Sequence, residues 1–408
     1  EFFMEKTKII KILLVGGTFN NTQTADGHYG KRSGLVDKLI PKISRAIFSK
    51  GFDPNLNVFN GGSYDIIDTI LGMTPDYDIV FWFANVDNSL PKIRDVKAVA
   101  PRTMLVTSKR NDNGKYSFQE LIQRALASKS NLVFEFNKIK DKLFNIHIFD
   151  PLGCEWYNGT NLQAAADAAI DRLLYLKSIT RQSTTKSDTS NGLVLSWYFD
   201  SFKQDMQQAD DTVAVPDETK FIELVRSYAE KFHEIMQLAK DVKRFLGNCS
   251  AKPLPPQVGR CSKGMPSFKT EDYIFVSQRN VNKEYLDISH FVPVYEENGK
   301  IYYCGDNKPS VDTPIQLRLY KALPNIRYMI HSHCYAENAV MTTKSIPCGA
   351  IEEVDEVLQT IDKTYGTRDA DKYIINLKGH GSIIMGKTID DISGVKYFGR
   401  EMPEKMWE

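Results

Sequence analysis

Between residues 8 and 178, apolar runs alternate with helix-like repeats along the chain. The apolar run 11–15, closed by two glycines and a threonine, is typical of a buried parallel strand that leads into a glycine turn. Similar patterns predict further strands at 56–59, 78–84, 103–107, 131–136 and 143–149, and amphipathic helices at 34–49, 117–127 and 161–177. Strands that alternate with helices favour βαβ units. The prediction is therefore a Rossmann-like α/β domain with a parallel sheet covered on both faces.

A polar stretch without apolar periodicity follows, and it predicts a linker at 179–191. The pattern at 193–219 favours no single element, so we treat 179–219 as a linker and connecting segment. A long amphipathic helix at 220–246 opens a second domain, which we expect to extend to residue 408. This domain has predicted strands at 273–277, 291–295, 300–304 and 328–331, and a predicted helix at 314–323.

The composition fits a globular chain with real cores, because 42% of the 408 residues are hydrophobic and 25% are charged. A net charge of +1 gives no support for nucleic acid or a membrane surface as partner. No apolar run is long enough to span a membrane. The six cysteines are scattered and form no C-x-x-C pair, which favours a reducing compartment, so we predict a cytoplasmic location.

Three histidines of the second domain follow apolar runs that read as strands. His331 and His333 form an H-x-H pair at a strand end, where residues two apart point to the same face. His380 follows a second apolar run, at 373–377. Three neutral imidazoles with an open fourth position are typical of a catalytic zinc site. The alternative is three unrelated histidines.

The order of motifs around this pair is distinctive. Lys308-Pro309-Ser310-Val311-Asp312-Thr313-Pro314 precedes Leu319-Tyr320, Leu323-Pro324-Asn325-Ile326 and Ile330-His331-Ser332-His333, and Leu377-Lys378-Gly379-His380-Gly381 comes later. From roughly residue 220 to 400 the chain resembles the class II aldolase/adducin family. The motifs are closest to those of its L-ribulose-5-phosphate 4-epimerase and L-fuculose-phosphate aldolase members. We therefore expect a class II aldolase-like α/β domain.

The resemblance implies roles for single residues. His331, His333 and His380 would bind a divalent metal, with zinc expected. Asp312 stands at the family's acidic position, which is the catalytic glutamate of the aldolases and an aspartate close to the metal in the epimerase. Asp355 lies at the offset of the epimerase's catalytic aspartate from an Ile-Pro pair. Its alternative is a solvated helix face, because it stands in a run of acids.

The family's phosphate-binding turns are altered in this chain. Gly259-Arg260-Cys261-Ser262 stands in place of its G-N-x-S turn and Ser277-Gln278-Arg279-Asn280 in place of its T-P-[ST]-G turn, and Ser310 keeps one of its paired serines. The expected phosphate ligands are Gly259, Arg260, Ser262, Ser277, Arg279 and Ser310. Arginines bind phosphate with two hydrogen bonds, so an anionic substrate still fits. The alternative is that both arginines are ordinary surface residues.

The function implied is that of a metal-dependent lyase that cleaves a phosphorylated ketose through an enediolate. A sugar-phosphate 4-epimerase would use the same site, and a third alternative is a non-catalytic scaffold like adducin. No residue matches the catalytic tyrosine near the C-terminus of the relatives, so the proton donor is unassigned. The resemblance also implies a homo-oligomer, a tetramer with active sites between subunits.

Glycine-rich segments of the first domain suggest a second ligand site. Gly16, Gly17 and Thr18 end the first strand, and Lys31 and Arg32 precede a predicted helix. Backbone amides, a helix N-terminus and two cations attract phosphate, so we expect a nucleotide or sugar phosphate here. The sequence is neither a Walker A loop nor G-x-G-x-x-G. The alternative is a glycine-rich connection at the edge of the sheet.

Overall fold

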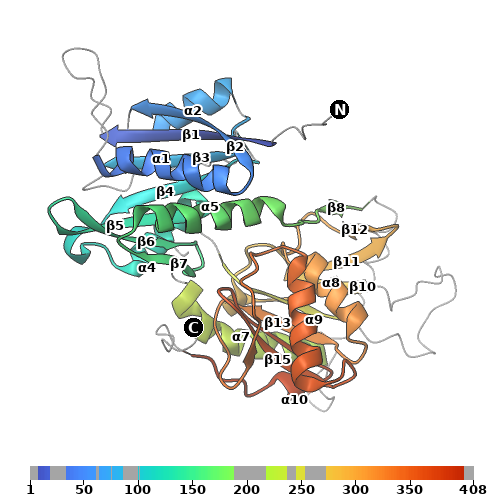
Figure 1. Ribbon diagram of the computed structural model, residues 1–408. Helices are drawn as coiled ribbons and strands as arrows, with labels where there is room; N and C mark the ends of the chain where they lie inside the picture. The colour runs from blue at the N-terminus through green and yellow to red at the C-terminus, as the bar shows by residue number, and fades with distance from the viewer. Residues whose placement is uncertain are drawn as a thin grey trace, which may run out of the picture. The chain divides into compact units, whose positions relative to one another are not determined.

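The computed structural model describes residues 8–18, 34–60, 64–74, 76–85, 100, 102–187, 217–236, 245–252 and 273–398. The chain divides into two compact units, Glu1–Ser178 and Ile179–Glu408, each with its own sheet and helices (Figure 1). This mixed α/β architecture confirms the predicted fold class. Among the described helices, none combines the length and the apolar character needed to cross a membrane.

The first unit is built on a seven-stranded sheet in the order β2-β1-β3-β4-β5-β6-β7. Its strands are β1 (Lys8–Thr18), β2 (Phe52–Asn60), β3 (Ile79–Asn85), β4 (Met104–Arg110), β5 (Leu132–Lys140), β6 (Leu143–Phe149) and β7 (Glu155–Gly159). The first five are mutually parallel, whereas β6 and β7 add antiparallel pairs at one edge. Only two residues join β5 to β6, and a connection that short permits an antiparallel pair alone. The expectation of a parallel sheet throughout is corrected there.

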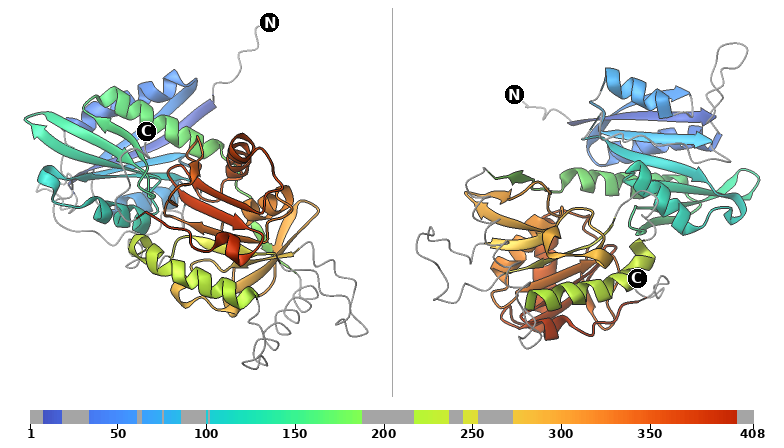
Figure 2. Two further views of the ribbon diagram at one scale, coloured as in Figure 1. Left: turned by 90° about the horizontal axis from the view of Figure 1, so that it is seen from below. Right: turned by 180° about the vertical axis from the view of Figure 1, so that it is seen from behind.

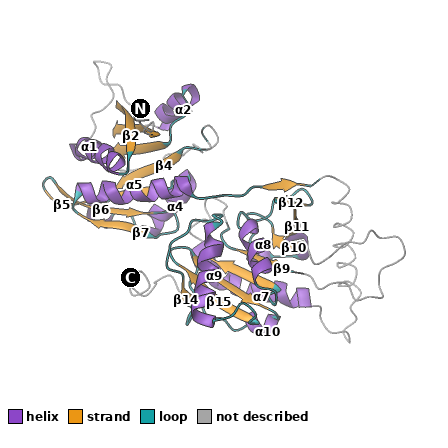
Figure 3. Cartoon of the chain, turned by 45° about the vertical axis from the view of Figure 1, so that its right-hand side comes forward, coloured by secondary structure: helices purple, strands orange, loops and turns teal. Residues whose placement is uncertain are grey.

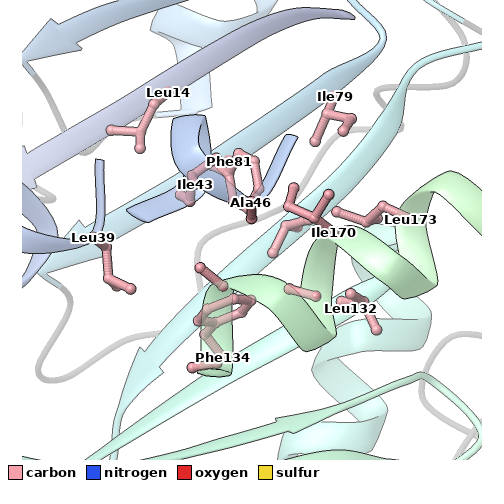
Figure 4. Close-up of a cluster of buried hydrophobic side chains, with 14 of the residues drawn as sticks. Leu14, Leu39, Ile43, Ala46, Ile79, Phe81, Leu132, Phe134, Ile170 and Leu173 are labelled. Atoms are coloured by element: carbon pink, nitrogen blue, oxygen red, sulfur yellow. The ribbon is translucent and has the colours of Figure 1, made fainter. Parts of the chain in front are cut away.

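Helices cover both faces of this sheet. They are α1 (Gly34–Ser49), α2 (Tyr64–Met73), α4 (Phe118–Ser128) and α5 (Leu162–Ser178), with a short 3₁₀ helix, η1 (Asp112–Gly114). Side chains of α1 and α5 form one core with alternate strand residues, as Ile43 and Ile170 do with Phe81 (Figure 4). Helix α2 packs on the opposite face against Leu13 and Val80. Burial on both faces explains why these strands read as continuous apolar runs.

The second unit has a nine-stranded sheet in the order β14-β15-β16-β13-β9-β10-β11-β12-β8. Its strands are β8 (Thr184–Lys186), β9 (Asn248–Ala251), β10 (Tyr273–Ser277), β11 (Phe291–Glu297), β12 (Lys300–Tyr303), β13 (Tyr328–Ser332), β14 (Val340–Met341), β15 (Lys372–Leu377) and β16 (Gly381–Gly386). Most neighbours are antiparallel. Strand β8 lies inside the segment expected to be a linker. It pairs in parallel with β12, so residues 184–186 form the edge strand of the sheet rather than part of a linker.

Two helix layers enclose this sheet. The helices are α7 (Asp217–Met236), α8 (Thr313–Ala322), α9 (Glu352–Tyr365) and α10 (Ile389–Ile392), with 3₁₀ helices η4 (Lys283–Tyr285) and η5 (Ile288–His290). One core joins α8 and α9 to the sheet, and a second joins α7 and α10 to its other face. Figures 2 and 3 show α7 and α9 on opposite sides of the strands. The central strand β13 is therefore deeply buried, and its end carries the histidine pair.

Candidate metal centre

Strand β13 and the hairpin of β15 and β16 bring the three histidines together. Strand β13 pairs with β16, so the turn that carries His380 lies beside the end that carries His333. Gly381 makes this approach possible: its φ is +128°, and a Cβ there would lie 2.0 Å from the carbonyl oxygen of Ser332. Any other residue would collide with that backbone, so the glycine after His380 has a local structural cause.

The imidazoles of His331, His333 and His380 form one compact group. Their ring centroids are 5.1, 4.6 and 5.0 Å apart, and one nitrogen of each lies within 4.8 Å of the others. His331 and His380 are buried, whereas His333 is half-buried. A metal ion held here would therefore lie between two buried ligands and one ligand that is partly exposed to solvent.

Hydrogen bonds orient two of these rings. Nδ1 of His331 donates to the carbonyl oxygen of Ser382 at 2.9 Å, and Nδ1 of His380 bonds the Glu353 carboxylate at 2.7 Å. Among the described residues, Nε2 of His331 and Nδ1 of His333 have no hydrogen-bond partner. Buried nitrogens are nearly always satisfied, and metal-binding histidines typically bond a carbonyl or carboxylate through the other nitrogen. The residues present therefore fit a divalent metal.

The protonation states favour metal binding at two of the three rings. Burial, reinforced by the charge of His380, lowers the pKa of His331 to about 4. Burial also lowers the pKa of His333 well below its ordinary value. For His380 burial acts in the same direction, but Cys348 and Glu353 outweigh it and raise the pKa of that imidazole. His331 and His333 thus keep a free lone pair at neutral pH.

Asp312 lies directly before α8 and beside the histidines. Its Oδ2 is 3.9 Å from Nε2 of His331. The side-chain amide of Asn248 donates to the same oxygen at 2.7 Å, and the backbone N–H of Gly349 donates to Oδ1 at 2.8 Å. Gln316 donates in turn to Asn248. This chain of hydrogen bonds fixes the carboxylate at the edge of the cluster.

Helix α9 contributes Glu353 to the cluster, and the predicted catalytic Asp355 lies on the same helix outside the cluster. Asp355 is exposed, whereas Glu353 is buried and bonds His380. Residues two apart on a helix differ by about 200° in direction, so one of the pair faces solvent when the other faces the core. Glu353 is next to Val354, which begins the buried stripe continued by Val357 and Ile361. That apolar spacing is the signal that could have identified the inward-facing acid.

Asn248 is a residue of the site that is not among those predicted from the sequence. Gly247-Asn248-Cys249-Ser250 matches that pattern letter by letter and forms the start of β9 beside β13. Gly259, Arg260 and Ser262, which had been assigned to it, lie outside the described residues. A direct search for the four-residue pattern would have found the turn.

The other expected phosphate ligands lie on two adjacent segments. The backbone N–H of Ser310 donates to the carbonyl oxygen of Ser277 at 3.2 Å, and that of Arg279 donates to Lys308 at 2.7 Å. The hydroxyl of Ser277 accepts a hydrogen bond from the backbone of Cys249 at 3.1 Å. The side chain of Arg279 is exposed. These segments lead directly into Asp312 and so into the histidine cluster.

The glycine segment of the first unit is described only in part. Gly16 is buried in β1, and Gly17 and Thr18 end that strand opposite Ala84 and Asn85 of β3. Lys31 and Arg32 lie outside the described residues.

Comparison with known proteins identifies the class of the second unit. Residues 229–394 match the family model of the Class II Aldolase and Adducin N-terminal domain. Over these residues of the second unit, the resemblance expected from the motifs is confirmed. The match does not extend into the first unit. No curated protein sequence matches the chain.

Similar solved structures include two aldolase-type proteins and a flavoprotein. L-fuculose 1-phosphate aldolase from Glaciozyma antarctica PI12 is 12% identical, with 44% of this chain and 70% of that chain covered and a TM-score of 0.27. YgbL from Escherichia coli, a putative aldolase/epimerase/decarboxylase, is 13% identical, with 45% and 97% covered and a TM-score of 0.25. The DNA/pantothenate metabolism flavoprotein from Streptococcus pneumoniae is 12% identical, with 42% and 100% covered and a TM-score of 0.33.

Replacing Glu353 with glutamine should weaken metal binding about 10- to 100-fold, as is usual for partners of metal-bound histidines. The amide keeps the shape but loses the charge that supports Nδ1–H of His380. Competition with a metal-chelating dye measures the affinity. Asp355→Asn, on the same helix but exposed, is the matched control and should bind metal normally. Equal affinities in the two variants would contradict the role given to Glu353.

Because Lys283 of η4 is buried, the stability of the protein should depend on pH. Its side chain is 3% exposed, and its amine donates to the carbonyl oxygen of Leu246 at 3.3 Å. Burial lowers its pKa to about 8, against the opposing effect of Cys249 and Asp312. An unfolded lysine titrates near pH 10.4, so between about pH 8 and 10 the unfolded chain binds more protons than the folded chain. The free energy of unfolding should therefore rise with pH in that window, by about 3 kcal/mol at most.

Lys283→Met should remove this rise and be the more stable protein at pH 7. Urea unfolding at pH 7, 8 and 10 measures the difference from the unmodified chain. Lys363→Met, at an exposed position of α9, should leave the increase in the free energy of unfolding with pH unchanged. If the free energy of unfolding of Lys283→Met rises with pH as much as that of the unmodified protein, Lys283 keeps its charge in the folded state between about pH 8 and 10.

Proposed function

We propose that the second unit is a metal-dependent carbon–carbon lyase of the aldolase type that acts on a phosphorylated ketose. The observation that carries the proposal is the compact histidine cluster beside the Asp312 carboxylate. In it, Nε2 of His331 is buried and has no hydrogen-bond partner in the part of the chain that the structure describes. His331, His333 and His380 would hold one divalent ion, and three imidazoles favour zinc. When bound, the ion would polarise the ketose carbonyl and stabilise the negative charge that develops when the neighbouring carbon–carbon bond breaks.

Asp312 is proposed to move a proton between the substrate and the site. It is anchored from behind by Asn248 and Gly349, which leaves the carboxylate little freedom to turn. A fixed carboxylate beside the reacting carbons is suited to general acid–base catalysis. The second proton donor is unassigned in this chain, and a neighbouring subunit of the expected tetramer would supply it.

The substrate phosphate is proposed to bind where the segments of Ser277, Arg279 and Ser310 meet. Two hydroxyls and a guanidinium on adjacent backbone segments suit a phosphate group. The side chain of Arg279 is exposed and so accessible to a soluble ligand. Asn248 lies between this area and Asp312, which would couple phosphate binding to the position of the carboxylate.

One feature favours an epimerase as the second candidate. The acidic position holds aspartate, as in the epimerases that the Lys308–Pro314 motif resembles, rather than the glutamate of the aldolases. Epimerisation by cleavage and re-addition uses the same bond-breaking step. The two activities differ in their products, because an epimerase releases no free aldehyde.

The first unit is proposed to bind a nucleotide or a sugar phosphate at the carboxyl end of its sheet. Strands β1, β3 and β4 are parallel neighbours, so they end at one edge. Ligands of open α/β sheets bind at that edge. Gly16, Gly17 and Thr18 end β1 there, and Lys31 and Arg32 are proposed to add positive charge.

A panel of ketose phosphates, incubated with the zinc-loaded protein, tests the proposed activity. We expect release of an aldehyde and a three-carbon ketone phosphate from at least one substrate, and loss of activity on chelation with recovery on adding zinc. Inversion at one carbon without aldehyde release would favour the epimerase. Metal-loaded protein that transforms no member of the panel by either route would contradict the proposal.

A further inference from the structure

Arg124, on α4 of the first unit, is a buried cation, and two of its nitrogens have no acceptor among the described residues. Its side chain is 5% exposed, and within the described residues its Nε and Nη1 have no hydrogen-bond partner. Burial lowers the pKa of this guanidinium to about 10. An unpaired buried charge is costly, and nearly all buried donors are satisfied in folded proteins. The acceptor for Arg124 is therefore expected to be a ligand.

Two lysines gather at the same place, around the ring of Tyr116. The amine of Lys109 lies 4.4 Å from the centre of this ring and that of Lys115 lies 5.5 Å from it. The phenol of Tyr116 also lies near enough to Arg124 to oppose the effect of burial on the pKa of Arg124. Two lysine amines thus approach one half-buried aromatic ring, whose phenol also interacts electrostatically with Arg124.

The backbone of Tyr116 is held in place by Asn111, and the nearby Glu135 carboxylate already has partners. The side chain of Asn111 accepts a hydrogen bond from the backbone N–H of Tyr116 at 2.7 Å and donates to its carbonyl oxygen at 2.9 Å. Glu135 stands opposite Lys109 in the register of β4 and β5. Its two oxygens bond Asn111 at 2.6 Å and His147 at 2.9 Å. Glu135 is therefore not the counterion that Arg124 lacks.

The location is one where ligands bind in sheets of this kind. Lys109 is near the carboxyl end of β4, and β4 is next to β3, which is next to β1. This is the edge at which Thr18 ends β1 and at which open α/β sheets hold their ligands. A guanidinium with two nitrogens that lack a partner among the described residues is suited to an oxyanion.

We infer that Arg124, together with Lys109 and Tyr116, forms a subsite of the first unit that binds an oxyanion, the phosphate or carboxylate group of a small molecule. The inference rests on the ligand-binding role proposed for this unit and identifies the residue that anchors the anion. It does not involve the metal centre.

The test uses the full-length chain with arginine labelled in its side-chain nitrogens. Arg124→Met identifies the Nε–H signal of Arg124 by its loss. Adding pyrophosphate or ATP to the unmodified protein should shift that signal, which separates this site from any phosphate site in the second unit. Arg124→Met should bind the same probe about 10- to 100-fold more weakly at the first unit, the usual loss for a charge-assisted pair. Arg45→Met, at an exposed position of α1, should bind normally.

Succinate serves as the carboxylate probe, and a shift with succinate alone would identify a carboxylate ligand. Thermal unfolding of Arg124→Met should occur at or above the temperature of the unmodified protein, because the substitution removes an unpaired buried charge. If ATP binds the first unit without moving the Arg124 signal, and equally well in Arg124→Met, the subsite is wrong while the role of the unit stands. If no probe binds the first unit, both are wrong.

Discussion

Asp312→Asn should retain the bound metal while its turnover falls by a factor of about 10²–10⁴, the usual share of a general acid–base group. The amide matches the carboxylate in shape but cannot accept a proton, and Asp312 is not one of the three proposed ligands. Metal content and steady-state rates on the best substrate of the ketose phosphate panel measure the two effects separately. Asp306→Asn, an exposed aspartate that pairs with Lys186, is the matched control and should be fully active.

The position of Asp312 allows the experiment to distinguish a metal ligand from a proton carrier. Oδ2 of Asp312 lies 3.9 Å from His331, close to the cluster yet held away from it by Asn248. If Asp312→Asn lost the metal, the carboxylate would be a ligand rather than a proton carrier. If the variant turned over at the normal rate, it would be neither. Unfolding temperatures of both variants separate these results from damage to the hydrogen bond with Asn248.

His333→Ala should abolish both metal binding and activity. Two imidazoles remain, and two protein ligands bind zinc too weakly to retain it during dialysis. The substitution should leave the fold intact, since Nδ1 of His333 has no hydrogen-bond partner in the described part of the chain. We expect less than about a tenth of the metal content of the unmodified protein after dialysis, and no measurable cleavage.

His290→Ala is the control for His333→Ala, because His290 belongs to η5 and lies outside the cluster. It should keep metal and activity, with a small loss of stability from the hydrogen bond that it makes to the backbone of Asp287. Full metal occupancy in His333→Ala would show that the ion is held elsewhere.

Much of this architecture could be predicted because burial leaves a clear pattern in the sequence. The strands β1, β3 and β4 are covered on both faces, so each reads as an unbroken apolar run. The H-x-H pair could be placed on one face because the side-chain direction alternates along a strand. Its meeting with His380 depends on the pairing of β13 with β16, which the resemblance supplied and periodicity alone could not.

The features that could not be predicted are ones that apolar patterning does not encode. The direction of β6 is set by a two-residue turn, and the pairing of β8 is set by backbone hydrogen bonds that any polar segment can make. In the acidic run on α9, charge alone does not distinguish Glu353 from Asp355. The two side chains point to different faces of α9, and the inward face can be identified from the buried residues Val354, Val357 and Ile361.

X-ray absorption at the metal edge of the zinc-loaded protein tests the central claim most directly. The account predicts one ion per chain, with three imidazole nitrogens at about 2.0–2.1 Å and the remaining position filled by an oxygen. The Cys348 sulfur, which lies 2.9 Å from Nε2 of His380, should not appear in the coordination sphere. A spectrum with fewer than three imidazoles, or a chain that binds no ion, would contradict the assignment of His331, His333 and His380 as the metal site.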